Sequence, residues 1–205
     1  MAVCAVVWDM DGTLLDSSVA VPAAFVAALR RRGGPVIDAA QVIAAYPLGT
    51  SEVILAYLAG REITSDDIEE YYRELARLPV EPYRGVVDVL ADLRARGQAI
   101  AVFTGASSRA ADILLAAAGI APDVLVGGDQ VRHPKPAADG LLLTADLLGV
   151  RPADLAYVGD SPQDIGAARA AGSHGAAAAW GHMYDPAAPA DSVLTAPGEV
   201  LALLD

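Results

Sequence analysis

The chain has 205 residues, and its 26 acidic side chains outnumber its 14 lysines and arginines, which gives a formal net charge of −12 at pH 7. So acidic a composition argues against nucleic acids and anionic membranes as partners, because both bind to basic surfaces. The length is enough for one well-buried core and one small additional module.

The first predicted element is a strand over residues 3–8, an unbroken apolar run that is typical of a strand buried on both faces. No basic segment precedes it and no apolar run is long enough to span a bilayer, so we expect neither a signal peptide nor a membrane segment. A cytoplasmic protein is the expectation that follows. Cys4, the single cysteine, lies in this strand, cannot form an internal disulfide and is expected to be a buried small side chain.

Residues 17–81 are predicted to be entirely helical. The apolar positions of the first helix follow a period of about 3.6 residues, and the helix ends at Gly33. Asp38 and Thr64 are expected to cap later helices, as is Thr50 or Ser51. The four helices are expected over residues 21–32, 38–45, 51–58 and about 64–78.

From Tyr83 onward, predicted strands and helices alternate, which indicates a parallel sheet with right-handed crossovers. The expected fold is α/β, with a Rossmann-like core formed by residues 1–16 and 82–205 and an α-helical cap formed by residues 17–81. Further strands are expected at 99–103, 124–126, 155–158, 175–179 and, at an edge, 192–194. Further helices are expected at 86–96, 108–118, 136–148, 164–171 and 197–204.

Polar side chains follow several predicted strands at their carboxyl ends, where the working residues of parallel sheets lie. Burying such charges is costly unless they are paired or bound to a metal ion. At any single position a capping or turn role is the simpler explanation, but the feature recurs at four strand ends. A divalent cation beside a phosphate would account for the set: Asp9, Asp11, Thr104, Lys135 (the only lysine), Asp160 and Asp164. The three histidines lack metal-ligand spacing and are expected on the surface or in loops: His133, His174 and His182.

Four short motifs stand in order along the chain: Asp9-Met10-Asp11-Gly12-Thr13, Thr104-Gly105, Lys135-Pro136 and Gly159-Asp160-Ser161-Pro162-Gln163-Asp164. Together they resemble the four motifs of a known family, the haloacid dehalogenase superfamily. The helical insert after the first motif resembles the small α-helical cap of the phosphoglycolate phosphatase and β-phosphoglucomutase branch. The resemblance covers nearly the whole chain.

The resemblance implies a Mg²⁺-dependent phosphatase acting on a small soluble phosphomonoester, as a monomer or homodimer. It implies that Asp9 is the nucleophile, which forms an aspartyl-phosphate, and that Asp11 is the general acid and base. The phosphate would be bound by Thr104, Lys135 and the backbone N–H groups of Met10 and Gly105. The Mg²⁺ site would comprise Asp9, the Asp11 carbonyl, Asp160 and, beside them, Asp164.

Two alternatives remain open at this point, a sugar phosphomutase of the same fold and a non-catalytic phosphate-binding regulator. Residues 46–50 resemble the substrate-specificity loop of the family's cap. No basic residue lies between Arg32 and Arg61, so the leaving group is expected to be small or uncharged. Arg84 and Arg109 are the basic residues that would weaken this expectation if they reached the site.

Overall fold

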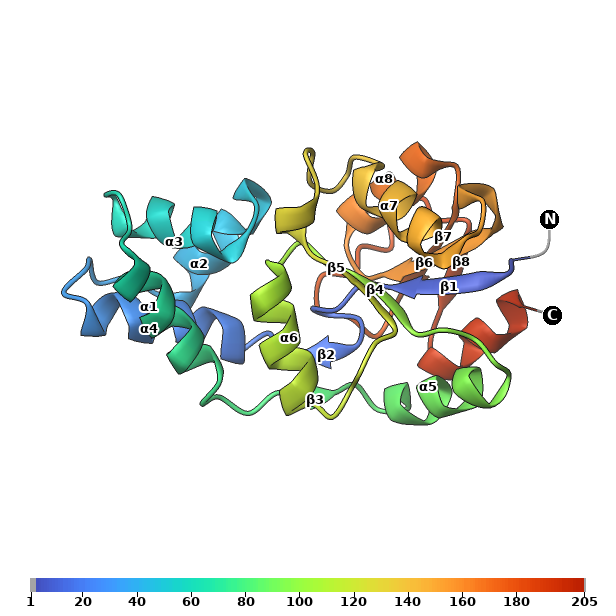
Figure 1. The fold of residues 1–205 in the computed structure, drawn as a ribbon, viewed down its shortest axis with the longest axis horizontal. Coiled ribbons are helices and arrows are strands. Elements are labelled where there is room, and N and C mark those ends of the chain that lie inside the picture. The colour runs from blue at the N-terminus through green and yellow to red at the C-terminus, as the bar shows by residue number, and fades with distance from the viewer. Residues whose placement is uncertain (1–2, 205) are drawn as a thin grey trace.

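A computed structural model of the protein describes residues 3–204, and its centre is a six-stranded parallel sheet with the order β5-β4-β1-β6-β7-β8 (Figure 1). Strand β1 lies in the middle, between β4 and β6, as expected of the predicted α/β class with a Rossmann-like core. Residues 1–2 and 205, which the sequence analysis assigns to the core domain, lie outside the described residues. The strands are β1 Ala5–Trp8, β4 Ala101–Phe103, β5 Val124–Val126, β6 Leu155–Gly159, β7 His174–Ala178 and β8 Ser192–Leu194.

Four helices, α1 to α4, form a block beside the sheet, at the left of Figure 1. They join the rest of the chain through a small antiparallel sheet in which β2 Leu15–Asp16 pairs with β3 Glu81–Pro82. No described helix has the length and apolarity needed to cross a lipid bilayer. The α-helices are α1 Ala20–Arg31, α2 Ala39–Ala45, α3 Ser51–Ala59, α4 Ser65–Leu75, α5 Val86–Ala95, α6 Ser108–Ala117, α7 Asp139–Leu148 and α8 Pro162–Ala171. The 3₁₀ helices are η1 Tyr46–Leu48, η2 Gly128–Gln130, η3 Pro152–Asp154 and η4 Pro197–Leu203.

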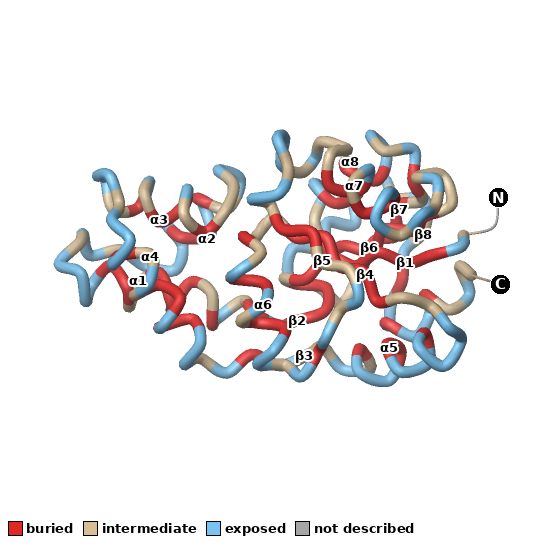
Figure 2. The backbone as a smooth tube through the Cα atoms, in the orientation of Figure 1, coloured by how far each residue is buried: buried red, intermediate tan, exposed pale blue. Residues whose placement is uncertain are grey.

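The side chains of the sheet alternate between two apolar cores, because successive residues of a strand point to opposite faces. In β1, Val6 and Trp8 enter the core shared with α5, α6 and η4, whereas Val7 enters the core shared with α7 and α8. Figure 1 shows α7 and α8 above the sheet and α5 below it, and Figure 2 shows the central strands as continuously buried. Since helices cover both faces, the strand ends are the part of the sheet left open for a site.

The expected burial of Cys4 is wrong. Strand pairing begins one residue later, with Ala5 beside Leu155, so Cys4 precedes the covered part of β1 and is exposed. His174, expected on the surface or in a loop, lies instead at the start of β7 and is half-buried. In both cases the side chain sits at the amino end of a strand, where small shifts in pairing decide its exposure.

Three predicted helices differ from those observed. The helix expected to run to about residue 78 ends at Leu75. The helix expected from residue 136 begins only at Asp139, because a turn precedes it in which the Ala137 N–H donates to the Pro134 carbonyl (2.9 Å). That turn carries Lys135 toward the strand ends. The last predicted helix is a 3₁₀ helix, η4, rather than an α-helix.

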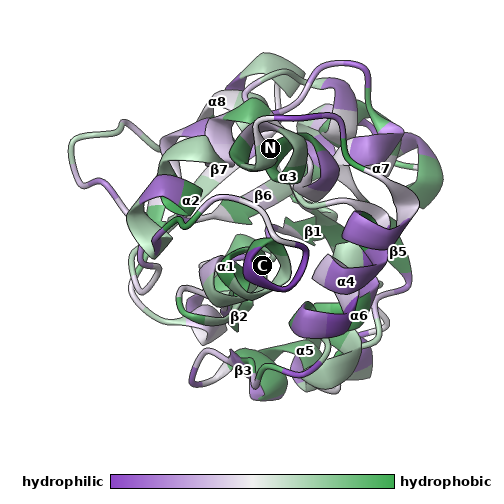
Figure 3. Ribbon diagram, turned by 90° about the vertical axis from the view of Figure 1, so that its left-hand side faces the viewer, coloured by the Kyte–Doolittle hydropathy of each residue, from purple (hydrophilic) through white to green (hydrophobic). Residues whose placement is uncertain are grey.

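A buried carboxylate holds the first turn of α4. Asp67 accepts a hydrogen bond from the Thr64 N–H (2.9 Å), and the Thr64 hydroxyl accepts one from the Asp67 N–H (3.3 Å), which is a reciprocal cap. Arg61 donates to Asp67 from two nitrogens (2.8 and 2.9 Å), and Arg32 donates at 2.9 Å. The Arg61 guanidinium, more than any other group, holds the pKa of Asp67 well below its usual range. Figure 3 shows α4 as mainly hydrophilic, so polar contacts fix its start.

Replacing Asp67 by Asn should lower the free energy of unfolding by about 2 kcal/mol, because the amide loses charge-assisted bonds to two arginines. The pKa of Asp67 is lowered on folding, so its stabilisation is complete above the pKa of the unfolded carboxyl and declines as the pH falls below it. Urea unfolding at pH 7 and pH 3 should therefore give a smaller deficit at pH 3. Asp66→Asn, at a neighbour whose side chain is 78% exposed, is the matched control and should change little. An equal deficit at both pH values would contradict this account.

Candidate active site

The two acidic residues of the first motif lie where β1 ends. The Asp9 N–H still donates to the Val158 carbonyl of β6 (2.8 Å), which fixes Asp9 at the sheet edge beside Asp160. Gly12 then turns the chain with φ of 83°, and a Cβ there would lie 2.2 Å from Asp160 Oδ2. A glycine is needed at this position both for the backbone conformation and for the close approach of the Asp160 carboxylate.

Lys135 joins the acidic residues of two strand ends. Its Nζ lies 2.6 Å from Asp9 Oδ1 and 2.7 Å from Asp164 Oδ1, with only 10% of its side chain exposed. Burial by itself would lower the pKa of Lys135, but Asp164 and Asp9 raise it well above its ordinary value. The lysine is therefore a buried ammonium ion paired with two carboxylates.

Tyr157, which the sequence analysis did not single out, also contacts this lysine. Its hydroxyl lies 3.1 Å from Lys135 Nζ and donates to the Phe103 carbonyl (2.9 Å). The side chain is fully buried within β6. A tyrosine inside an otherwise apolar strand is itself a sequence signal, because its hydroxyl requires a buried polar partner.

Three carboxylates gather around this ammonium ion. Carboxylate oxygens of Asp9, Asp160 and Asp164 all lie within 4.8 Å of one another, and all three residues are buried. Burial raises the pKa of Asp9 well above its ordinary value and that of Asp160 to about 6, and the neighbouring carboxylates add to both increases. Clustered oxygen donors of this kind fit a hard divalent cation, which would stabilise their ionised forms.

Asp11 lies apart from this cluster, with a different partner. It accepts a hydrogen bond from the Ser17 hydroxyl (2.5 Å), and burial raises its pKa above the ordinary value. A carboxyl group with a raised pKa is suited to donating and accepting protons near neutral pH. Ser17 was not identified from the sequence, since nothing in the spacing of six residues indicates that the two side chains meet.

A pocket opens in front of these groups, between the strand ends and the helices α1 to α3. Two residues predicted for the site do not line the pocket. They are Asp164, whose carboxylate pairs with Lys135, and Met10, whose side chain is buried in the apolar core. The pocket includes Gln163 of α8, which sequence reasoning did not assign. Six of the residues predicted for the site line the pocket: Asp9, Asp11, Thr104, Gly105, Lys135 and Asp160.

The opposite wall of the pocket is largely apolar. Among the described residues that line the pocket as a whole, Lys135 and His182 are the only ones with a basic side chain. The His182 ring contacts the Tyr83 hydroxyl through Nδ1 (3.2 Å), which the sequence analysis did not anticipate. The side chains contributed by the four-helix block are Val21, Phe25, Ile43, Tyr46, Pro47, Ser51 and Ile54, together with Gly49.

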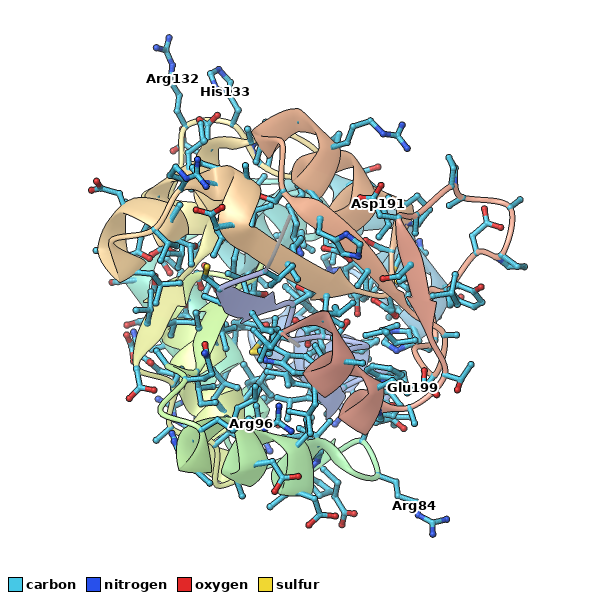
Figure 4. The ribbon with its side chains drawn as sticks, turned by 90° about the vertical axis from the view of Figure 1, so that its right-hand side faces the viewer. Arg84, Arg96, Arg132, His133, Asp191 and Glu199 are labelled. Atoms are coloured by element: carbon cyan, nitrogen blue, oxygen red, sulfur yellow. The ribbon has the colours of Figure 1, made fainter. Side chains whose placement is uncertain are left out.

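Neither of the two arginines considered from the sequence lines the pocket. Arg84 is exposed and points away from the molecule (Figure 4). Arg109 is held by the Glu69 carboxylate, to which both of its terminal nitrogens donate. Neither arginine therefore weakens the expectation of a small or uncharged leaving group, which stays a prediction.

The haloacid dehalogenase-like hydrolase family matches residues 3–172. The chain belongs to this family. The probable phosphatase IndB of Dickeya dadantii (strain 3937) is 35% identical over 191 residues, covering 88% of this chain and 83% of the relative. The phosphoglycolate phosphatase of Xanthomonas campestris pv. campestris (strain 8004) is 35% identical over 185 residues, covering 87% and 84%.

Among solved structures, CbbY from Rhodobacter sphaeroides in complex with phosphate has the same fold. Its TM-score is 0.84 with 23% sequence identity, and the match covers 99% of both chains. The match to the family and the two relatives at 35% identity confirm the family identified from the four motifs. The protein is a haloacid dehalogenase-like hydrolase whose relatives are phosphatases.

Proposed function

We propose that this hydrolase is a Mg²⁺-dependent phosphatase that cleaves a small phosphomonoester through an aspartyl-phosphate on Asp9. One observation carries the proposal: the buried Asp9 carboxylate lies 2.6 Å from the Lys135 ammonium group at the base of a pocket. The relatives named as phosphatases support the same class of reaction. In this proposal residues 17–81 act as the cap domain, and residues 1–16 and 82–205 act as the catalytic core.

In the first half of the reaction, an Asp9 oxygen attacks phosphorus, and the bond from phosphorus to the leaving oxygen breaks. Asp11 gives its proton to that oxygen, so the leaving group departs as an alcohol. In the second half, Asp11 accepts a proton from a water molecule that attacks the aspartyl-phosphate. The products are inorganic phosphate and the regenerated Asp9 carboxylate, and Asp11 is again protonated.

The remaining site residues bind and orient the phosphate. Lys135 offsets negative charge at the reacting group, and the Thr104 hydroxyl with the backbone N–H groups of Met10 and Gly105 would hold its oxygens. Mg²⁺, when bound, would offset the repulsion between a carboxylate and a phosphate dianion. The residues that would hold it are Asp9, the Asp11 carbonyl and Asp160, with Asp164 adjacent.

The apolar cap wall supports a neutral leaving group. A second anionic group on the substrate would lose hydration in the pocket, which is costly without a cationic partner. The only basic side chains among the described lining residues are Lys135, at the phosphate end, and His182. The same absence of cap cations among the lining residues argues against a bisphosphate bound for phosphomutase chemistry. The presence of all the carboxylates that the proposed reaction requires argues against a purely phosphate-binding regulator.

A panel of phosphomonoesters tests the proposal. In Mg²⁺, esters with neutral leaving groups should have kcat/KM values at least about tenfold above those of phosphoglycolate and of sugar bisphosphates, because the latter lack a charge-assisted partner in the pocket. Phosphate release should stop when EDTA removes the metal ion. A strong preference for phosphoglycolate or a bisphosphate would refute the assignment of the leaving group, and isomerisation without phosphate release would establish a mutase.

A further inference from the structure

Tyr72 of α4 connects the cap to the loop that follows β4. Its side chain is buried, and its hydroxyl lies 2.9 Å from the hydroxyl of Ser107, which is only 2% exposed. Ser107 ends the segment that begins with Thr104 and Gly105, both of which line the pocket. A cap side chain thus contacts the same short loop that the proposed function assigns to phosphate binding.

The direction of this hydrogen bond follows from counting protons. Tyr72 has a single hydroxyl proton, and it donates that proton to the Glu52 carboxylate at the start of α3. Burial, together with the bond to Glu52, raises the pKa of Tyr72, so the hydroxyl stays protonated. Ser107 must therefore donate to the Tyr72 oxygen, which gives a directed chain from Ser107 through Tyr72 to Glu52.

Ser107 occupies a position where a serine ordinarily does something else. It is the N-cap residue of α6, and such a hydroxyl usually accepts a hydrogen bond from the first turn of its own helix. Here the Ser107 side chain makes no capping hydrogen bond. Its hydroxyl is used across the boundary with the cap instead.

One neighbouring contact holds Tyr72 in this orientation, and a second brings the cap close to the loop. The Arg109 guanidinium of α6 lies 4.2 Å from the centre of the Tyr72 ring while it pairs with Glu69 of α4. Close to the loop, a Cβ at Gly128 of η2 would lie 2.5 Å from the Gly105 carbonyl and 3.3 Å from the Thr50 methyl group. Thr50 directly precedes α3, so the cap segment that carries Glu52 approaches η2, whose Gly128 N–H donates to the Ala106 carbonyl of the loop (2.8 Å).

We propose that Tyr72 is a positioning residue whose hydroxyl couples the closed cap to the ordered phosphate loop. The inference rests on the proposed function, because that function assigns phosphate binding to Thr104 and Gly105, at the start of the loop over residues 104–107. In the closed arrangement, Ser107 and Glu52 both have a partner; when the cap moves away, the Ser107 hydroxyl loses its partner and the loop loses a constraint. Phosphate bound by the loop should favour cap closure, and cap closure should tighten phosphate binding by the same factor.

The variant Tyr72→Phe tests this because it removes the hydroxyl and keeps the ring under Arg109. The dissociation constant of inorganic phosphate, titrated calorimetrically in Mg²⁺, should rise about three- to tenfold. Deuterium uptake of residues 104–108 should rise as well. The matched control is Tyr71→Phe, which removes a buried hydroxyl bonded within the cap to Ser51 (3.3 Å). The control should lower thermal stability comparably and leave both readouts unchanged.

A second variant makes the test independent of folding defects. Ser107→Ala should reproduce both changes, and the double variant should be no worse than either single variant, since both remove one hydrogen bond. Additive losses, or unchanged deuterium uptake in Tyr72→Phe, would overturn the role of Tyr72. Wild-type protein that bound no phosphate would overturn the proposed function instead, and deuterium uptake of residues 104–108 would still decide the coupling.

Discussion

Replacing Asp9 by Asn should lower kcat for Mg²⁺-dependent release of phosphate from p-nitrophenyl phosphate by about 10⁴-fold or more. An amide has nearly the size of a carboxylate but is a far weaker nucleophile, so the aspartyl-phosphate does not form. The change also removes one oxygen anion from the cluster that faces Asp160 and Asp164. Steady-state kinetics measure the loss of activity, and the intact mass of the protein shows whether the aspartyl-phosphate still forms.

The fold should survive this substitution. Burial raises the pKa of Asp9 well above its ordinary value, so its ionised form is destabilised by the protein interior and the neutral amide relieves that cost. Thermal unfolding should show a Tm equal to or above that of the wild type. Asp16→Asn, at an exposed position that contacts Ser18, is the matched control and should retain full activity. Residual activity of Asp9→Asn within tenfold of the wild type would exclude Asp9 as the nucleophile.

The meeting of three site residues follows from local sequence. Asp9, Thr104 and Asp160 each directly follow a buried strand, and the carboxyl ends of parallel strands share one edge, so the three had to lie together. The order of the strands in the sheet was not predicted, because the handedness of a crossover does not say on which side the next strand lies. Local patterns therefore predicted the core and the charged base of the pocket.

Contacts that depend on the fold as a whole were not predictable in this way. Tyr157 and Ser17 contact site residues through side-chain directions that no spacing reveals. The cap wall depends on how β2 and β3 orient the helical block over the strand ends, and this orientation is a property of tertiary packing. Arg109 illustrates the limit: it lies in α6, three residues beyond pocket-lining Ala106, yet it binds Glu69.

Replacing Lys135, the single lysine of the chain, should also have a large effect on activity. Lys135→Met should lower kcat/KM by about 10²–10³, because the reacting phosphate loses its fixed cationic donor. The same change leaves Asp9 and Asp164 without their shared ammonium partner at 2.6 and 2.7 Å, so the metal-free protein should be less stable than the wild type.

Magnesium separates this electrostatic effect from simple damage to the core. With the ammonium ion gone, the three carboxylates attract a divalent cation more strongly, and a ligand that binds only the folded state stabilises it in proportion to its affinity. Added Mg²⁺ should therefore raise the Tm of Lys135→Met by more than it raises that of the wild type. Arg132→Met is the matched control, because Arg132 is an exposed cation of the same loop that points into solvent (Figure 4). If Mg²⁺ stabilised Lys135→Met less than the wild type, the lysine and the metal ion would not share one acidic cluster, and the proposed site would be wrong.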